Sequence, residues 1–248
     1  MKIAVIGSNG FIGSELFLLL KKGSFDVYGI TRKNYKQMIQ EDYEVVIDCA
    51  GNSKKYLSLN DHVYDYEKNV IELEQRITEI KFDKYILISS IDSIYKLNIF
   101  YGLHKKIGEN ILLNYCEQNN KICTIIRCAS VLGNDMKKGL IYDIINDKKV
   151  YLTEDSYLRF VRIDDLFNII HREVNKNGFS KKSLTYNLCS NSVSIDYIRR
   201  FFNKNINFNS DLRKSSYEKE LYDCQFKDSD IDIILNAEEI FKAMEKKI

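Results

Sequence analysis

The chain has 248 residues, of which 45% are hydrophobic, enough to bury a sizeable core in one large domain or in one domain with a small appendage. Its 37 lysines and arginines nearly balance its 35 aspartates and glutamates, so the net charge of +2 predicts no strong, sequence-independent attraction to nucleic acid or anionic lipid. We therefore expect a small-molecule partner, and neither nucleic acid nor a membrane.

Apolar runs of strand length alternate with amphipathic stretches in the first half of the chain. Buried parallel strands have such continuous runs, whereas half-exposed strands alternate. The predicted strands are 2–6, 26–30, 45–50, 85–89 and 122–127, and the predicted helices between them are 11–22, 63–80 and 100–118. Alternating β and α units imply right-handed crossovers. The expected fold class is therefore α/β, a Rossmann-type doubly wound parallel sheet.

The pattern becomes mixed after about Val131. Short strands are predicted at 150–153, 160–163 and 184–188, and helices at 164–174, 195–202 and 237–247. The sequence has no repeat of solenoid length and no low-complexity linker. We expect residues 1–130 to form a dinucleotide-binding Rossmann domain, and residues 131–248 to form a small substrate-binding region that is interleaved with the sheet.

Three glycines, spaced three apart, separate the first predicted strand from the first predicted helix. Gly7 can take the tight turn, Gly10 lets the backbone approach a pyrophosphate, and Gly13 allows close packing of helix on strand. A glycine-containing turn that binds nothing is the alternative, but the position and the spacing together favour a dinucleotide site. The predicted contacts are Gly7, Asn9, Gly10, Phe11, Ile12 and Gly13.

The end of the second predicted strand bears on which dinucleotide is bound. An acidic residue there is typical of NAD sites, because it accepts hydrogen bonds from the ribose hydroxyls. Here the segment contains Thr31, Arg32 and Lys33 and no carboxylate. Arg32 could pair with a 2′-phosphate and Thr31 could supply a hydroxyl, although a solvated strand end would look similar. We therefore expect NADP(H), with NAD(H) as the alternative cofactor.

A tyrosine, a lysine and two serines form the next group of candidate residues. Tyr101 and Lys105 are four residues apart on a predicted helix, so they share one face. A nearby ammonium stabilises a tyrosinate and lowers the tyrosine pKa, which suits it to proton transfer. Ser89 and Ser90 end a buried strand, where a hydroxyl can donate to a substrate carbonyl. The alternatives are a surface contact for the tyrosine–lysine pair and turn capping for the serines.

Taken in order, these features resemble the extended, nucleotide-sugar-modifying group of the short-chain dehydrogenase/reductase family. Its signature is a glycine turn, a serine at a strand end and Tyr-x-x-x-Lys on the next helix. Further segments resemble the family's turn beside the cofactor, its helix asparagine, its Arg-Pro-x-x-Val-Tyr-Gly segment, the stretch before its Asp-containing helix and its late strand: 46–51, 69–70, 126–133, 159–165 and 186–188.

The resemblance implies roles for individual residues. Tyr101 would exchange the substrate hydroxyl proton, Lys105 would lower the tyrosine pKa and hold the nicotinamide ribose, and Ser90 would orient the carbonyl. Ser89 and Ser93 are alternatives for the serine role. The cofactor would also contact residues of the third predicted strand end, of the tyrosine helix and of the fifth strand, namely Cys49, Ala50, Gly51, Tyr101, Lys105 and Cys128.

The implied function is an NADP(H)-dependent reduction of a keto group on a nucleotide-linked sugar. A nucleotide-sugar 4-epimerase or dehydratase with tightly bound NAD is the alternative enzyme, and a non-catalytic NAD(P)-sensing protein is the alternative of another class. Asp92 stands where family dehydratases place an acid, but Ser93 replaces the following glutamate, which argues against elimination. The sequence leaves the oligomeric state open, but many relatives form a homodimer through the helices that correspond to 63–80 and 100–118.

The remaining polar residues carry weaker expectations. His104 is expected to be solvated or sheet-facing, Arg159 and Arg162 are candidates for a substrate diphosphate or for the surface, and Asp164 and Asp165 are expected to cap a helix. The cysteines form no Cys-x-x-Cys pair and several lie in apolar runs, which favours a reducing, cytoplasmic environment and no zinc site. They are Cys49, Cys116, Cys123, Cys128, Cys189 and Cys224.

Overall fold

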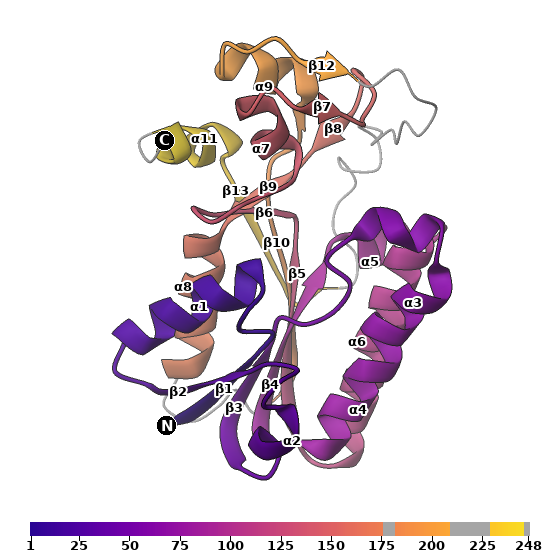
Figure 1. The fold of residues 1–248 in the computed structure, drawn as a ribbon. Helices are drawn as coiled ribbons and strands as arrows, with labels where there is room; N and C mark the ends of the chain where they lie inside the picture. Colours follow the sequence, from indigo (N-terminus) through magenta and orange to yellow (C-terminus); the bar gives the residue numbers. More distant parts are fainter. Residues whose placement is uncertain (176–181, 209–228, 246–248) are drawn as a thin grey trace.

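A seven-stranded, wholly parallel sheet forms the centre of the molecule (Figure 1). The computed structural model describes residues 1–175, 182–208 and 229–245. The sheet order is β13-β10-β5-β4-β3-β1-β2. The strands are β1 (Lys2–Ile6), β2 (Asp26–Ile30), β3 (Asp42–Asp48), β4 (Lys81–Ser90), β5 (Ile122–Cys128), β10 (Leu184–Ser190) and β13 (Ile231–Leu235). Because β2 and β3 lie on opposite sides of β1, the connections diverge there and open a crevice at the carboxyl edge.

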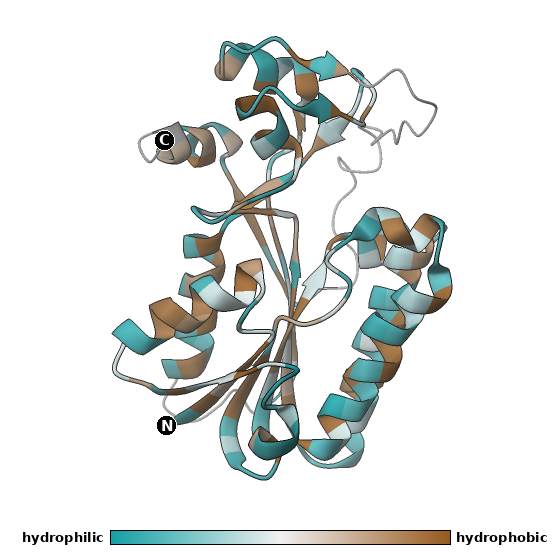
Figure 2. Cartoon of the chain, viewed as in Figure 1, coloured by the Kyte–Doolittle hydropathy of each residue, from teal (hydrophilic) through white to brown (hydrophobic). Residues whose placement is uncertain are grey.

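Helices cover both faces of the sheet. The helices α1 (Phe11–Lys22) and α8 (Ile163–Asn175) lie on one face, and α3 (His62–Tyr66), the π-helical turn η2 (Glu67–Ile71), α4 (Glu72–Glu79) and α6 (Phe100–Gln118) lie on the other (Figure 1). Two hydrophobic cores result, one on each face. Figure 2 shows hydrophobic residues concentrated on the strands and mixed with hydrophilic ones along the helices, as amphipathic packing requires.

The second half of the chain contributes to two places. It supplies β10 and β13 to the sheet and α8 to its face, and it forms a separate cluster beyond the carboxyl edge, at the top of Figure 1. Phe160, Ile198 and Phe241 are buried in the core of this cluster. Its elements are β6 (Ser130–Leu132), α7 (Leu140–Ile145), β7 (Lys149–Val150), β8 (Tyr157–Leu158), β9 (Phe160–Arg162), β11 (Val193–Ser194), α9 (Ile195–Phe201), β12 (Asn207–Phe208) and α11 (Ala237–Glu245).

The expected fold class is confirmed, and the strands and helices differ from prediction mainly at their ends. The predicted helix 63–80 is a succession of three helical segments, and the predicted strand 150–153 ends at Val150. Nine described elements were not predicted: α2 (Tyr35–Met38), η1 (Lys55–Leu59), α5 (Asp92–Tyr95), β6, α7, β8, β11, β12 and β13. The cysteines of the described segments are free thiols. Cys224 and the last two residues of the predicted helix 237–247 lie outside the described residues.

Candidate functional site

The glycine turn joins β1 to α1 at the carboxyl edge of the sheet. Gly7 has a φ of +76°, which favours glycine, and its N–H donates to the Ile30 carbonyl at 2.9 Å. A Cβ on Gly13 would lie 2.3 Å from the Gly7 oxygen, so no side chain fits there. Gly10 occupies the N-cap of α1 and brings no side chain over the N–H groups of the first turn. This bare helix start fits the pyrophosphate of a dinucleotide.

The other residues predicted on this turn differ in exposure. Asn9 is exposed at its tip, while Phe11 and Ile12 are half-buried in the first turn of α1. Asn9 comes just before α1 and the other two residues begin it. All three therefore lie beside the helix N-terminus, at the crevice where the connections of the sheet diverge.

The end of β2 is organised by Asn34. The Asn34 Oδ1 accepts hydrogen bonds from the Thr31 N–H at 2.7 Å and from the Thr31 hydroxyl at 2.9 Å. The Thr31 hydroxyl proton is thus directed at Asn34 and not at the cofactor crevice, whereas Arg32 is exposed. On η2, the hydrogen bond that Lys68 donates to Glu72 raises the pKa of Lys68. The positive charge of Arg32 opposes that rise, so Arg32 lies within electrostatic reach of η2.

The turn after β3 is anchored by a fully buried carboxylate. Asp48 accepts hydrogen bonds from Arg76 Nε at 2.8 Å, from the Tyr85 hydroxyl at 2.6 Å and from the Ala50 N–H at 2.8 Å. The neighbouring Cys49 is half-buried and its N–H donates to the Ile6 carbonyl at 3.1 Å. Asp48 thereby ties the predicted cofactor turn to α4 and β4.

Lys105 reaches this turn from α6. Gly51 has a φ of +136°, and a Cβ there would lie 2.8 Å from Asn69 Oδ1 and 3.1 Å from Lys105 Nζ. A side chain at residue 51 would therefore collide with Asn69 and crowd the Lys105 ammonium, so glycine is needed there. Lys105 Nζ therefore lies beside the turn that follows β3.

The structure brings Ser90, Tyr101 and Lys105 together. Ser90 ends β4, its side chain is hydrogen-bonded to Tyr101, and Lys105 Nζ lies 5.9 Å from the centroid of the Tyr101 ring. Burial lowers the pKa of Lys105, and the charge of Asp48 opposes that change. A hydroxyl, a phenol and an ammonium thus face one another at the carboxyl edge, where proton transfer to a substrate oxygen is chemically possible.

The ionisation of Tyr101 differs from the expectation. The sequence predicts a lowered tyrosine pKa, but in the structure the pKa of Tyr101 is raised, first by burial and then by the negative charge of Asp92. Lys55 and the hydrogen bond from Ser90 act in the opposite direction and are outweighed. At neutral pH the Tyr101 hydroxyl is therefore a protonated group that can donate.

The two alternative serines have another partner. Ser89 and Ser93 both donate hydrogen bonds to Glu109 Oε1, the latter at 2.8 Å. Glu109 Oε2 accepts from Arg127 Nη2 at 2.8 Å and from Arg127 Nε at 3.0 Å. Glu109 is fully buried, so it links β4, α5, β5 and α6 beneath the site. Ser90, which this carboxylate does not engage, faces Tyr101.

A second buried network joins α6 to α3 and η2. Asp65 accepts hydrogen bonds from Asn52 Nδ2 at 2.6 Å and from Asn69 Nδ2 at 2.9 Å, and its other oxygen lies 2.7 Å from His104 Nδ1. The expectation for His104 was wrong: it is neither solvated nor sheet-facing but buried against α3. Sequence spacing could not show that Asp65 and His104 meet, because they lie on different helices.

The other predicted residues have structural partners. Burial raises the pKa of the Cys128 thiol to about 12, and its side chain lies in the core beneath the sheet edge. Arg159 is buried and donates to the Ser190 carbonyl at 2.9 Å, while Arg162 is paired with Asp165 at 2.7 Å. Asp164 and Asp165 lie in the first turn of α8, which begins at Ile163.

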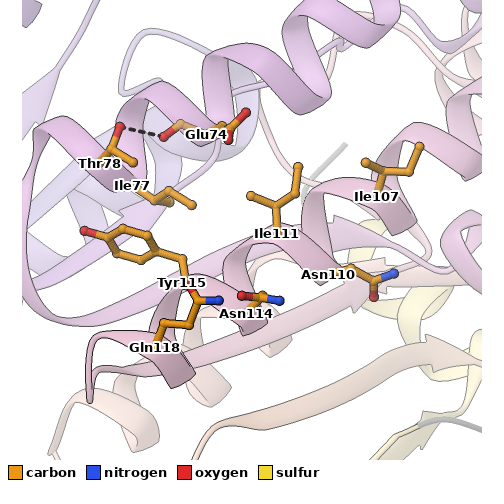
Figure 3. Close-up of a pocket in the computed structure, with 9 residues that line it drawn as sticks. All are labelled: Glu74, Ile77, Thr78, Ile107, Asn110, Ile111, Asn114, Tyr115 and Gln118. Carbon is orange, nitrogen blue, oxygen red and sulfur yellow. Dashed lines mark hydrogen bonds between the residues drawn. The ribbon is translucent and has the colours of Figure 1, made fainter.

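A groove of about 440 Å³ runs between α4 and α6, away from the glycine turn (Figure 3). Figure 3 shows Ile77 and Thr78 of α4 facing Ile111 and Tyr115 of α6 across it. Within residues 1–175, 182–208 and 229–245, no helix is long and apolar enough to cross a membrane, and no group of three acidic, histidine or cysteine side chains could hold a metal ion.

The sequence was compared with models of known protein families and with known proteins. The model of the NAD dependent epimerase/dehydratase family matches residues 3–189, which span the glycine turn, the catalytic candidates and most of the sheet. No curated protein sequence matches the chain.

Three solved structures illustrate the likeness. MoeE5 in complex with UDP-glucuronic acid and NAD has a TM-score of 0.75 and 14% identity, over 96% of this chain and 90% of that one. A UDP-glucuronic acid 4-epimerase from Bacillus cereus has a TM-score of 0.67 and 20% identity, over 92% and 95%. RMD from Pseudomonas aeruginosa, complexed with NADPH, has a TM-score of 0.69 and 15% identity, over 100% and 99%. At such low sequence identities, the similarity shows that this chain shares the fold of these proteins and nothing more.

Proposed function

The chain belongs to the NAD dependent epimerase/dehydratase family, and from that membership we propose that it is an NADP(H)-dependent reductase of a keto group on a nucleotide-linked sugar. Membership makes it an NAD(P)-binding enzyme of the oxidoreductase type. The substrate class and the direction of the reaction are our proposal. Residues 131–248 would supply the substrate-binding region, and the free thiols suit a cytoplasmic location.

The observation that carries the proposal is the meeting of Ser90, Tyr101 and Lys105 beside the glycine turn. A reduced nicotinamide cofactor, when bound, supplies a hydride to the carbonyl carbon. Tyr101 donates its hydroxyl proton to the carbonyl oxygen, and Ser90 donates a hydrogen bond to the same oxygen. Lys105 lies close enough to the Gly51 turn to hold a ribose hydroxyl. The product is an alcohol, and Tyr101 regains its proton from solvent.

Nucleotide-linked sugars are the proposed substrates because similar structures contain them. MoeE5 was solved with UDP-glucuronic acid, and the Bacillus cereus 4-epimerase with the same compound. The test is NADPH consumption with a panel of nucleotide-linked keto sugars and, as matched controls, the same nucleotides without the sugar. We expect turnover of one or more keto sugars and of no control. A folded, NADPH-binding enzyme that reduces no member of the panel would contradict the proposal and favour a cofactor-sensing role.

A 4-epimerase is the second candidate, because several similar structures are 4-epimerases, including ones complexed with NAD. An epimerase oxidises and re-reduces the same carbon, so it must retain its cofactor between the two steps. The absorbance and mass spectrum of the protein as purified distinguish the two candidates. A reductase should release its dinucleotide on dialysis, whereas an epimerase should keep about one NAD per chain.

Preference for NADP(H) should depend on Arg32. Replacing Arg32 with alanine removes the exposed guanidinium at the end of β2, so NADPH should bind about tenfold more weakly, the effect of losing one charge-assisted hydrogen bond. NADH carries no 2′-phosphate, and its dissociation constant should stay within about twofold. Lys36→Ala, which removes an exposed cation from α2, is the matched control. Equal NADPH and NADH affinity in the unmodified protein would overturn the proposed preference.

We also propose that a second copy of the chain covers the groove between α4 and α6. Outside the groove lining, Ile71 on η2 and Leu103 on α6 are 45% and 37% exposed, so the segments next to the groove carry further exposed apolar side chains. Ile111→Glu should convert a dimer into a monomer, because burying a carboxylate against a second copy is unfavourable. Light scattering checks the molar mass. Leu18→Glu, on the exposed side of α1, should leave the dimer intact. A monomeric unmodified protein would contradict this proposal.

A further inference from the structure

The side chain of Asn34 turns back to β2 and does not cap the helix that it precedes. Asn34 occupies the N-cap of α2, and its backbone carbonyl accepts hydrogen bonds from the N–H groups of Gln37 at 3.1 Å and Met38 at 3.0 Å. An asparagine at an N-cap commonly accepts a further hydrogen bond with its side-chain oxygen. Here the side chain makes no such bond, so its role lies outside α2.

The Asn34 side chain instead makes three hydrogen bonds to the end of β2. Its Oδ1 accepts from the Thr31 N–H at 2.7 Å and from the Thr31 hydroxyl at 2.9 Å, which engages both lone pairs of the amide oxygen. Its Nδ2 donates to the Gly29 carbonyl at 2.9 Å. These bonds tie the segment into a closed loop, and the exposed Arg32 belongs to that loop.

The same strand end is fixed to the glycine turn. The Ile30 carbonyl accepts hydrogen bonds from the Gly7 N–H at 2.9 Å and from the Ser8 N–H at 3.4 Å. A Cβ on Gly29 would lie 2.8 Å from Ser8 Oγ, so the turn packs directly against the strand there. Two successive carbonyls are thus held from two sides, Ile30 by the glycine turn and Gly29 by Asn34. Asn34 thereby fixes the loop relative to the turn that is predicted to receive the pyrophosphate.

Resting on the proposed preference for NADP(H), we propose that Asn34 is a positioning residue for cofactor selectivity, which holds the loop so that Arg32 meets the 2′-phosphate. The pyrophosphate and the 2′-phosphate belong to one dinucleotide, so a cation that binds the second must be held at a defined distance from the turn that binds the first. A guanidinium on a preorganised loop also loses less conformational entropy when it pairs. Thr31 donates both of its hydrogens to Asn34, so it supports the loop and has none to offer the phosphate.

The test is a double-mutant cycle on the dissociation constants for NADPH and NADH, measured without substrate. Asn34→Ala removes all three side-chain bonds, while the Tyr35 hydroxyl, which donates to Glu79 at 2.9 Å, should keep α2 on α4. We expect NADPH to bind about fivefold more weakly, and the constant for NADH, which has no 2′-phosphate, to change by less than about twofold. In an Arg32→Ala background, Asn34→Ala should change the NADPH constant by less than about twofold, because residues that act through one another are not additive.

Further variants separate the loop from its individual groups. Thr31→Val removes the hydroxyl but keeps the bonds of Asn34 to the Thr31 N–H and to Gly29, so NADPH should bind within about twofold of the unmodified protein. Asn119→Ala removes an exposed asparagine that donates to the Tyr115 carbonyl at the far end of α6, and it should change neither constant. Unchanged NADH binding shows that Asn34→Ala is folded. Asn34→Ser, whose shorter side chain cannot reach Thr31 and Gly29 together, should repeat the selective effect.

Three results would overturn the inference: an unchanged NADPH constant in Asn34→Ala, an equal loss of affinity for NADH, or the same loss with and without Arg32. If Thr31→Val weakened NADPH binding as much as Asn34→Ala does, the hydroxyl and not the loop would be what NADPH requires, and the inference would again be wrong. A failure of the proposed cofactor preference is distinct, because Arg32→Ala would then bind NADPH as tightly as the unmodified protein. None of these measurements requires turnover, so the proposed reduction is tested separately.

Discussion

Replacing Tyr101 with phenylalanine should lower the rate of keto reduction by about 10²- to 10⁴-fold, the contribution of a positioned general acid. The substitution removes one oxygen atom, the one hydrogen-bonded to Ser90. The ring and its packing against Lys55 and Lys105 remain. The loss should fall on kcat, because hydride addition without a proton donor leaves negative charge on the carbonyl oxygen. The rate of NADPH consumption at saturating substrate measures this effect.

Binding and stability measurements should distinguish lost chemistry from lost structure. The dissociation constant for NADPH should change by less than about threefold, because the tyrosine hydroxyl is only one of many predicted cofactor contacts and takes no part in the glycine turn. Tyr115→Phe makes the same change at the far end of α6, on the groove, and should leave the rate unaltered. If Tyr101→Phe reduced the substrate as fast as the unmodified protein, another group would have to donate the proton, and the assignment of Tyr101 would be wrong.

The elements of the sheet could be predicted because their signals are local. In β1, for example, four consecutive apolar residues are buried and the strand ends directly before Gly7. A strand buried on both faces requires such a continuous apolar run. The edge strand β13 was missed. Its residues alternate between half-buried and exposed, so Ile231–Leu235 does not have the pattern of a central strand. The four-residue helix α5 was missed because one turn carries no periodicity.

The candidate site was predictable only where spacing along one element determines the geometry. Tyr101 and Lys105 are one helical turn apart, so their proximity follows from the sequence alone. The choice among Ser89, Ser90 and Ser93 does not, since it depends on Glu109 approaching two of them from α6. The raised pKa of Tyr101 likewise arises from burial and from charges on other elements. Contacts of this kind exist only after the chain has folded.

Glu109 should be the site residue that depends most on contacts between different elements. Glu109→Ala should lower the free energy of unfolding by about 3 kcal/mol, because it removes the carboxylate that pairs with the buried Arg127 guanidinium. The same change deprives two serine hydroxyls of their common acceptor. Urea unfolding followed by circular dichroism measures the loss. Ser93→Ala removes a single donor from the same cluster and should cost about 1 kcal/mol.

The comparison of these two variants also tests how the serine is positioned. With Glu109 intact, Ser89 and Ser93 are held below the sheet edge and Ser90 is the hydroxyl that faces Tyr101. Without it, the strand end loses its anchor to α6, so Glu109→Ala should lower kcat at temperatures where the variant is still folded, whereas Ser93→Ala should not. A Glu109→Ala protein as stable as the unmodified one would mean that Arg127 and the serines find other partners, and the buried carboxylate would then not be what holds the site together.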